Sequence, residues 1–153
     1  MTRFPPMDEG PRFFTVEEAN ELVGTLEIEF GRISRVREAL GPVIAAVGGA
    51  DAAVAILHED TEPPAGREAE ADRLRALAAE LTGAIERVNA TGCLVKDVEQ
   101  GLVDFYSLMD DEPVFLCWQF GEPGVTHWHG VEEGFAGRRP IEGVTVVPPQ
   151  FPN

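Results

Sequence analysis

A histidine pair in the C-terminal third of the chain is the pattern with the clearest chemical potential. His127 and His129 flank Trp128 in a stretch of β-branched and aromatic residues that predicts a strand. Because residues i and i+2 of a strand point to the same face, the two imidazoles should lie side by side. Imidazole nitrogens are good ligands for zinc and other transition-metal ions. The triplet therefore predicts two ligands of a divalent metal such as zinc.

A metal site on this strand needs a further ligand, and the sequence offers several carboxylates. Asp104 falls in a neighbouring predicted strand, Glu122 in the turn before the histidines, and Glu132 or Glu133 just after them. A carboxylate would complete a zinc site whose bound water serves as the nucleophile of a hydrolase. The predicted ligand set is His127, His129, Asp104, Glu122 and Glu132.

Cys117 in the preceding strand is another candidate ligand, and the register of the hairpin decides whether it reaches the histidines. A tight turn at 121–124 would place Cys117 opposite Trp128 and His129 opposite Leu116. Cys117 would then point to the other side of the sheet, and only a one-residue shift would bring it back. In the predicted register the histidine face carries apolar residues, namely Val114, Leu116, Trp118, Phe120 and Val125.

Three interpretations of the histidine pair remain open at this point. The side chains can be half-buried core residues held by hydrogen bonds, metal ligands, or acid–base groups that act without a metal. Asp104 stands between apolar residues in its predicted strand, where a carboxylate needs a partner, and Arg138 or Arg139 is the expected one. Histidines sealed against the helices would be core residues, whereas histidines in a cleft beside a carboxylate would form a site.

The first element that must support this region is a long helix. Thr15 and Glu18 form a capping box, which predicts a helix start. Apolar residues then recur at spacings of three and four as far as Leu40. The dipeptide Gly41-Pro42 marks the expected end of this helix or a kink in it.

The remaining elements complete an α+β fold. A second long helix is expected from about 68 to 91, stopped by Gly92, with a short helix over 50–58 between the two. Two long helices with narrow apolar stripes most simply form an antiparallel hairpin, here over about 15–91. The region 93–147 has strand-like periodicity and predicts an antiparallel β-meander of about four strands, packed on the helical hairpin.

Length and composition predict one soluble domain over 13–147, with extended tails at 1–12 and 148–153. The chain has 153 residues, of which 44% are hydrophobic and 25% charged. Its 12 basic and 27 acidic side chains give a net charge of −15, so nucleic acid and membrane surfaces are not expected partners. Two cysteines without a metal or redox spacing, and no leader or spanning segment, predict a cytoplasmic protein with free thiols.

Several short blocks along the chain resemble a known bacterial family. They are Lys96-Asp97, Gly101-Leu102-Val103-Asp104-Phe105, Leu116-Cys117-Trp118, Gly121-Glu122-Pro123, Trp128-His129 and Gly134-Phe135-Ala136-Gly137-Arg138. With the opening segment 14–20, they resemble the uncharacterised bacterial family called domain of unknown function 2203, over roughly 13–141. The resemblance supports the domain boundaries and implies no reaction, ligand or partner.

Two functions are consistent with the sequence, which leaves open whether the protein is an enzyme. The first is a non-enzymatic binding or assembly module that acts through the helical hairpin or the exposed sheet face, as a homodimer or with a protein partner. It is favoured because a small meander covers only part of two long apolar stripes. The second is a small metal-dependent enzyme, for instance a hydrolase, with the histidine strand as metal ligands.

Overall fold

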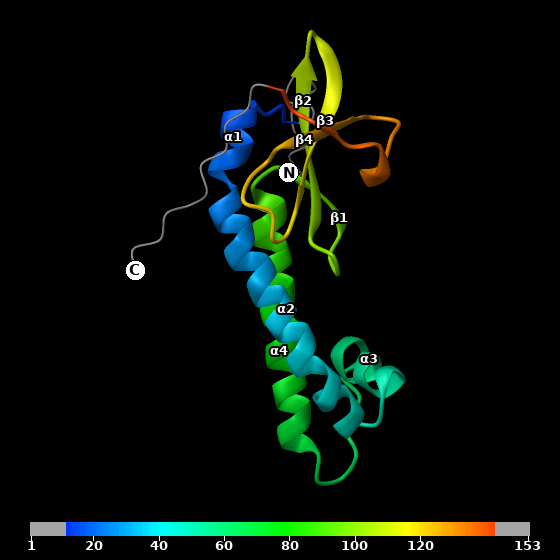
Figure 1. Ribbon diagram of the computed structural model, residues 1–153. Coiled ribbons are helices and arrows are strands. Elements are labelled where there is room, and N and C mark those ends of the chain that lie inside the picture. The colour runs from blue at the N-terminus through cyan, green and yellow to red at the C-terminus, as the bar shows by residue number, and fades with distance from the viewer. Residues whose placement is uncertain (1–11, 143–153) are drawn as a thin grey trace, which may run out of the picture. The chain divides into compact units, whose positions relative to one another are not determined.

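A computed structural model of the protein describes residues 12–142, in which contacts define two compact units. The first unit holds the described residues up to Phe30 and from Val88 onward, and the second holds 31–87. The elements, drawn in Figure 1, are α1 (Val16–Glu21), α2 (Val23–Ala46), α3 (Ala50–Glu59), α4 (Glu68–Ala90), β1 (Leu94–Asp97), β2 (Leu102–Met109), β3 (Glu112–Gln119), β4 (His127–Gly130), the 3-10 helix η1 (Phe135–Gly137) and β5 (Arg139–Pro140). This confirms the α+β class.

Two expectations about the chain's organisation stay predictions. A single domain over 13–147, with the helical hairpin packed on the sheet as one body, would extend over both units. The extended tails fall almost entirely outside the described residues 12–142. Within that range no single helix is long and apolar enough to cross a membrane, although α2 and α3 together, bent by 99°, pass the same test as a pair.

Helix α1 begins at the predicted capping box, and the residue before it is tied to the sheet. The Thr15 hydroxyl accepts from the Glu18 backbone N–H at 3.0 Å, and the Glu18 carboxylate accepts from the Thr15 N–H at 2.8 Å. The Phe14 N–H donates to the Tyr106 carbonyl at 2.7 Å, and the Ser107 hydroxyl donates to the Phe14 carbonyl at 2.6 Å. The start of the helical region is thereby fixed on β2.

The long helices follow their predicted limits with two exceptions. The helix expected to begin at the capping box is divided at Leu22 into α1 and α2. Helix α2 continues through Pro42 to Ala46, so of the two outcomes expected at Gly41-Pro42, an end or a kink, the end is wrong. It stops at Gly48 and Gly49, whose φ angles of +114° and +106° suit residues without a side chain. The short helix α3 and the end of α4 before Gly92, which has φ +95°, agree with the prediction.

The second unit has its own small core, built where the end of α2, α3 and the start of α4 meet. Five residues of this core are buried, and three residues of α2 pack against them. The buried residues are Val47, Ala53, Ile56, Ala71 and Leu74, and the α2 residues are Leu40, Val43 and Ile44. This cluster accounts for the apolar stripes in this part of the helices.

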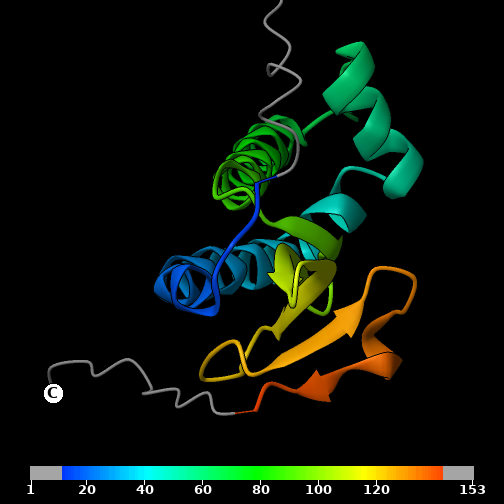
Figure 2. The ribbon, with the colours of Figure 1, turned by 90° about the horizontal axis from the view of Figure 1, so that it is seen from above.

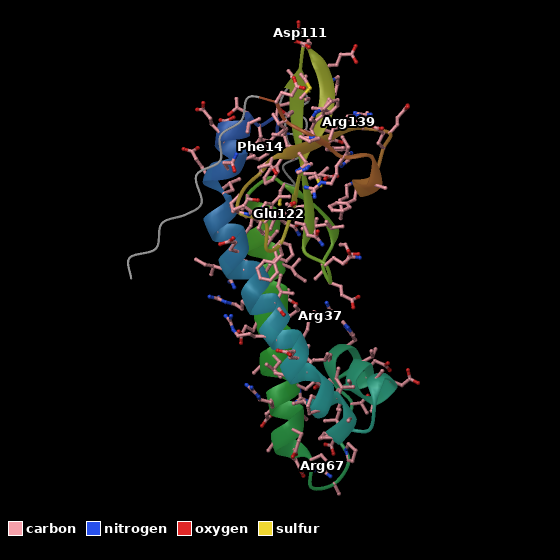
Figure 3. The ribbon with its side chains drawn as sticks, viewed as in Figure 1. Phe14, Arg37, Arg67, Asp111, Glu122 and Arg139 are labelled. Carbon is pink, nitrogen blue, oxygen red and sulfur yellow. The ribbon has the colours of Figure 1, made fainter. Side chains whose placement is uncertain are left out.

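The sheet is an antiparallel meander with strand order β1-β2-β3-β4-β5. The meander is as predicted, and the two-residue β5 adds one strand to the expected four. Strands β2 and β3 are joined by a tight hairpin whose tip is marked by Asp111 in Figure 3. Asp110 and Asp111 have φ angles of 52° and 65°, and positive φ at both central residues is the pattern of a type I′ turn.

The two faces of the sheet have different partners. One face packs against α1 and the first turns of α2, which lie beside the sheet in Figure 2. Phe14 meets Phe105 edge-on at a centroid distance of 5.0 Å, and Phe30 lies 6.2 Å from Trp118. Phe105 and Trp118 are completely buried there. The opposite face, away from these helices, carries the polar residues of the candidate site.

Candidate metal site

Strands β3 and β4 pair one residue away from the predicted register. Cys117 lies opposite His127, and Phe115 lies opposite His129. Cross-strand partners share a face of the sheet, so Cys117 is on the same face as the two histidines. The prediction that Cys117 points to the other side is therefore wrong. The expected apolar neighbours Leu116 and Trp118 are the ones that face the helices instead.

The shift has an identifiable cause in the connection between the two strands. The connection 120–126 contains an odd number of residues rather than a two-residue turn. Its far end is held by α1, because the Asn20 side chain accepts from the Val125 N–H at 2.7 Å and donates to the Val125 carbonyl at 3.3 Å. Its near end is held by the Trp118 indole, which donates to the Glu122 carbonyl at 3.1 Å.

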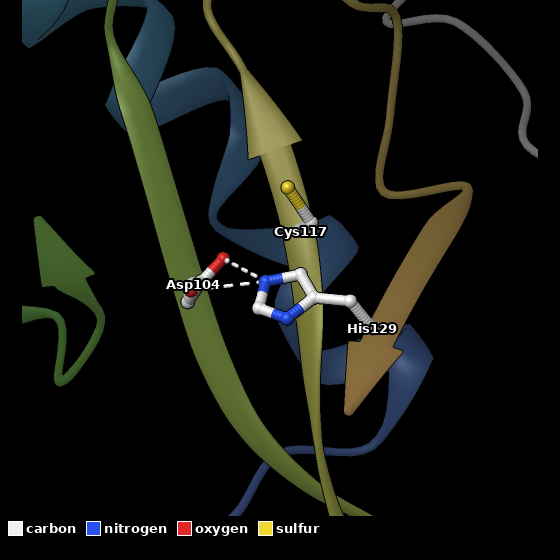
Figure 4. Close-up of side chains that lie close together, drawn as sticks. All are labelled: Asp104, Cys117 and His129. Atoms are coloured by element: carbon white, nitrogen blue, oxygen red, sulfur yellow. Dashed lines mark hydrogen bonds and ion pairs between the residues drawn. The ribbon is translucent and has the colours of Figure 1, made fainter. Parts of the chain in front are cut away.

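In this register three ligand-type side chains converge on the open face (Figure 4). Asp104 lies on β2 opposite Cys117 on β3, and His129 reaches across from β4. The His129 Nε2 atom lies 3.1 Å from each carboxyl oxygen of Asp104. One ligand atom from each of the three residues falls within 4.8 Å of the others, and all three residues are buried.

The hydrogen bonds of His129 fix which of its nitrogens faces the group. The His129 Nδ1 atom lies 2.9 Å from the Gly130 carbonyl oxygen. A carbonyl oxygen can only accept, so Nδ1 carries the proton and donates. The Nε2 atom then meets the Asp104 carboxyl group, where one proton or one metal ion can lie between them. A backbone carbonyl that holds the second imidazole nitrogen is a common feature of metal-ligating histidines.

The Cys117 thiol is protonated at neutral pH. Burial raises the pKa of Cys117 to about 12; the Arg138 guanidinium opposes this rise, whereas the Asp104 and Glu122 carboxylates add to it. Neither ring nitrogen of His129 is aimed at the thiol, since one meets Gly130 and the other Asp104. This geometry does not supply the activated thiolate that nucleophilic catalysis requires. A metal ion would favour the thiolate by direct binding.

The other predicted ligands do not join this group. His127 is half-buried and has its Nδ1 atom 2.9 Å from the Thr126 hydroxyl. The Glu122 carboxylate accepts from Arg138 at 2.9 and 3.0 Å, and from the Gln119 N–H at 2.8 Å. Glu132 is exposed and lines a separate pocket. Among the predicted ligands, only Asp104 and His129 come together.

The arginines also take partners other than the predicted one. Arg138 pairs with Glu122, and Arg139, labelled in Figure 3, pairs with Glu133 at 2.8 Å. Asp104, which was expected to pair with one of these arginines, has His129 as its partner. Both arginines additionally lie over aromatic rings, Arg138 over Phe135 and Arg139 over Trp128. These pairs fix the segment that follows β4.

A cavity of about 220 Å³ opens directly beside the three converging residues. Asp104, Cys117 and His129 form part of its wall. The rest of the wall comes from neighbouring strands and from the segment after β4, and consists of Lys96, Leu102, Phe115, Val131, Glu133, Gly134 and Phe135. His129 fits two of the three interpretations given above. It lies beside a carboxylate on the wall of the cavity, and it is also buried and held by hydrogen bonds to Gly130 and Asp104, as a core residue would be.

The fold and this group define a small α+β protein with a buried carboxyl, thiol and imidazole cluster on the wall of a cavity. The chain belongs to the family of uncharacterised conserved proteins called DUF2203, which it matches over residues 12–141. This confirms the family resemblance seen in the sequence. No curated protein and no solved structure matches the chain.

Proposed function

We propose that the protein binds one divalent transition-metal ion, with zinc as the best fit, through Asp104, Cys117 and His129. The observation that carries the proposal is the convergence of their three ligand atoms within 4.8 Å on the wall of a cavity. A carboxylate oxygen, a thiolate sulfur and an imidazole nitrogen are the ligands that zinc takes in proteins. The sequence favours an assembly role, and the cavity beside these residues is the reason to place metal binding first.

The site needs only a small adjustment to receive an ion. Ligand bonds of about 2.0–2.3 Å place the ligand atoms of a tetrahedral zinc roughly 3.3–3.8 Å apart. The present spacing ranges from 3.1 Å between His129 and Asp104 up to the 4.8 Å limit. Side-chain shifts of about 1 Å would therefore satisfy the geometry. The ion would replace the proton shared by His129 and Asp104 and the proton of the thiol.

Three protein ligands leave one tetrahedral position for another group, as in catalytic zinc sites. That position would face the cavity, because the other sides of the group are strands β2, β3 and β4. A water or substrate atom bound there would be polarised by the ion, which is the basis of metal-assisted hydrolysis. The proposal thus keeps the hydrolase alternative with a ligand set that differs from the predicted one.

The test is a measurement of metal content and metal affinity in matched variants. Protein purified without chelator is analysed by elemental mass spectrometry, and chelator-treated protein is titrated with zinc by calorimetry. We expect about one zinc per chain in the wild type and a loss of at least about 100-fold in affinity for Cys117→Ser and His129→Ala. Cys93→Ser and His127→Ala are the matched controls, because these residues lie outside the group. A wild-type protein that neither contains nor takes up metal would refute the proposal.

A second candidate function is self-association, and a groove in the second unit favours it. The groove has a volume of about 580 Å³ and is lined mainly by apolar side chains of α2, α3 and α4. Val54 and Leu57 line this groove and are 52% and 36% exposed. The exposed apolar side chains of α3 and the apolar groove lie on the same surface. Two copies could therefore pair about a twofold axis, with α3 of each copy in the groove of the other.

Light scattering at micromolar concentration tests this second proposal. We expect a dimer for the wild type and a monomer for Val54→Glu. The Ile28→Glu variant is the control, because Ile28 is 60% exposed and belongs to the first unit. A monomeric wild type, or equal effects of the two substitutions, would contradict self-association through the groove.

A further inference from the structure

The cavity beside the candidate metal group contains the only lysine of the chain. Lys96 is the single lysine among the 12 basic residues of the sequence. It falls at the bulge in β1, where the register shifts between Val95 and Asp97. A bulge redirects a side chain relative to its strand. Here the ammonium group lies 5.2 Å from the centroid of the Phe115 ring, and Lys96 forms part of the cavity wall while remaining exposed.

The charge of the metal-loaded cavity can be counted from these residues. A divalent ion is neutralised by one carboxylate and one thiolate, here Asp104 and Cys117, while His129 binds as a neutral ligand. The Glu133 carboxylate is paired with the Arg139 guanidinium at 2.8 Å. The ammonium group of Lys96 is then the one charge that is not balanced, so the net charge of the cavity is about one positive unit. This local positive charge favours an anion over a neutral molecule, although the chain as a whole has a net charge of −15.

The rest of the wall defines the body of the ligand. Apart from the charged groups and the metal ligands, the wall consists mainly of Leu102, Phe115, Val131 and Phe135. Apolar and aromatic walls bind an apolar body, and a few polar groups orient it. The cavity has a volume of about 220 Å³. A cavity of about 150 Å³ holds benzene, so by proportion this one holds roughly nine non-hydrogen atoms.

We propose that the cavity binds a small monocarboxylate with an aromatic or compact apolar body, whose carboxylate lies toward Lys96 and whose body packs against Phe115 and Phe135. The proposal rests on the proposed metal binding, because the charge count includes the ion. Benzoate, with its planar ring and single negative charge, has the size and charge of such a ligand. Benzamide has almost the same shape without the charge and is therefore the matched neutral probe.

The experiment compares the two probes on zinc-loaded protein by titration calorimetry or ligand-observed NMR. For the wild type we expect benzoate to bind at least about tenfold more tightly than benzamide, the effect of one charge-assisted hydrogen bond. The preference should fall to about threefold or less in Lys96→Gln and return in Lys96→Arg. Arg67→Gln is the control for net charge, because Arg67 lies in the second unit and far along the sequence from the cavity. It should retain the full preference.

The outcomes separate this inference from the metal proposal. Zinc titration of the same preparations reports metal binding independently of either probe. Zinc binding with no benzoate preference, or with a preference that Lys96→Gln leaves unchanged, overturns the carboxylate assignment alone. Failure to bind zinc overturns the metal proposal and the charge count together. Folding of Lys96→Gln is checked by its thermal melt, which should match the wild type because Lys96 is exposed.

Discussion

Replacement of His129 should destabilise the metal-free protein far more than replacement of His127, two residues away on the same strand. His129 is only 2% exposed and has Asp104 as a buried partner at 3.1 Å. Removal of His129 leaves the buried Asp104 carboxyl group without its partner, and breaking a buried pair in this way costs about 3–5 kcal/mol of unfolding free energy. At about 2–4 °C per kcal/mol for a chain of this size, His129→Ala should lower the Tm by roughly 6–20 °C. His127→Ala removes one partly buried hydrogen bond, so a loss of about 1 kcal/mol is expected.

The assay follows tryptophan fluorescence during thermal unfolding in the presence of a chelator. Trp118 and Trp128 are the two tryptophans of the chain, and both belong to the unit that carries the site. The signal therefore reports this unit rather than the helices at 31–87. Asp104→Asn keeps the shape of the side chain and should fall between the two histidine variants. Equal melting temperatures for His129→Ala and His127→Ala would refute the assignment of His129, rather than His127, to the buried pair.

Three further predictions test the surroundings of the site. Asn20→Ala leaves the N–H of the fully buried Val125 without its partner at 2.7 Å, so urea unfolding should show a loss of about 2 kcal/mol in unfolding free energy. An unchanged urea midpoint would show that α1 does not hold the β3–β4 connection. Gly101→Ala should lower the unfolding free energy by at least about 2 kcal/mol, because φ is +71° and the new Cβ would lie 2.5 Å from the Phe120 Cβ. A stability equal to that of the wild type would contradict this close approach. Burial raises the pKa of Cys117 to about 12 from 9.0, so the thiol ionises first in the unfolded chain, and the stability that it contributes is fully present below pH 9.0. The free energy of unfolding should fall by up to about 1.4 kcal/mol per pH unit as the pH rises from 9.0 toward 12. Urea titrations should show a smaller fall for Cys117→Ser than for the wild type, and equal falls would mean that the thiol is exposed.

The helices could be predicted from the sequence because their signals are local. The capping box at Thr15 and Glu18 and the glycine after α4 act within one helical turn, and both work as expected. Helix α2 continues past Pro42, although a proline inside a helix removes one backbone hydrogen bond and crowds the preceding turn. Packing of Leu40, Val43 and Ile44 against the small core of the second unit accompanies the continuation of the helix past it.

The candidate site could be predicted only in part. Asp104 and His129 were among the expected ligands, whereas Cys117 was excluded by the assumed register. The segment 114–118 is apolar at every position, so alternation does not reveal which residues face the helices. The end of the β3–β4 connection is held by a hydrogen bond between Asn20 and Val125, which lie 105 positions apart in the sequence. No local pattern contains that information. The position of Asp104 among apolar residues did indicate a buried partner, which is His129 rather than an arginine.

The odd length of the connection 120–126 has a consequence for how this protein can change over evolution. Removal or insertion of a single residue there would turn β4 over relative to β3, so that His129 and Cys117 would lie on opposite faces of the sheet. Removal or insertion of two residues would keep Cys117 and His129 on the same face of the sheet and would change only the length of the loop. Among relatives that keep Asp104, Cys117 and His129, lengths of this loop should therefore differ in steps of two. A loop-length parity of this kind can be read from sequences alone and would mark which members of the family can assemble the same group.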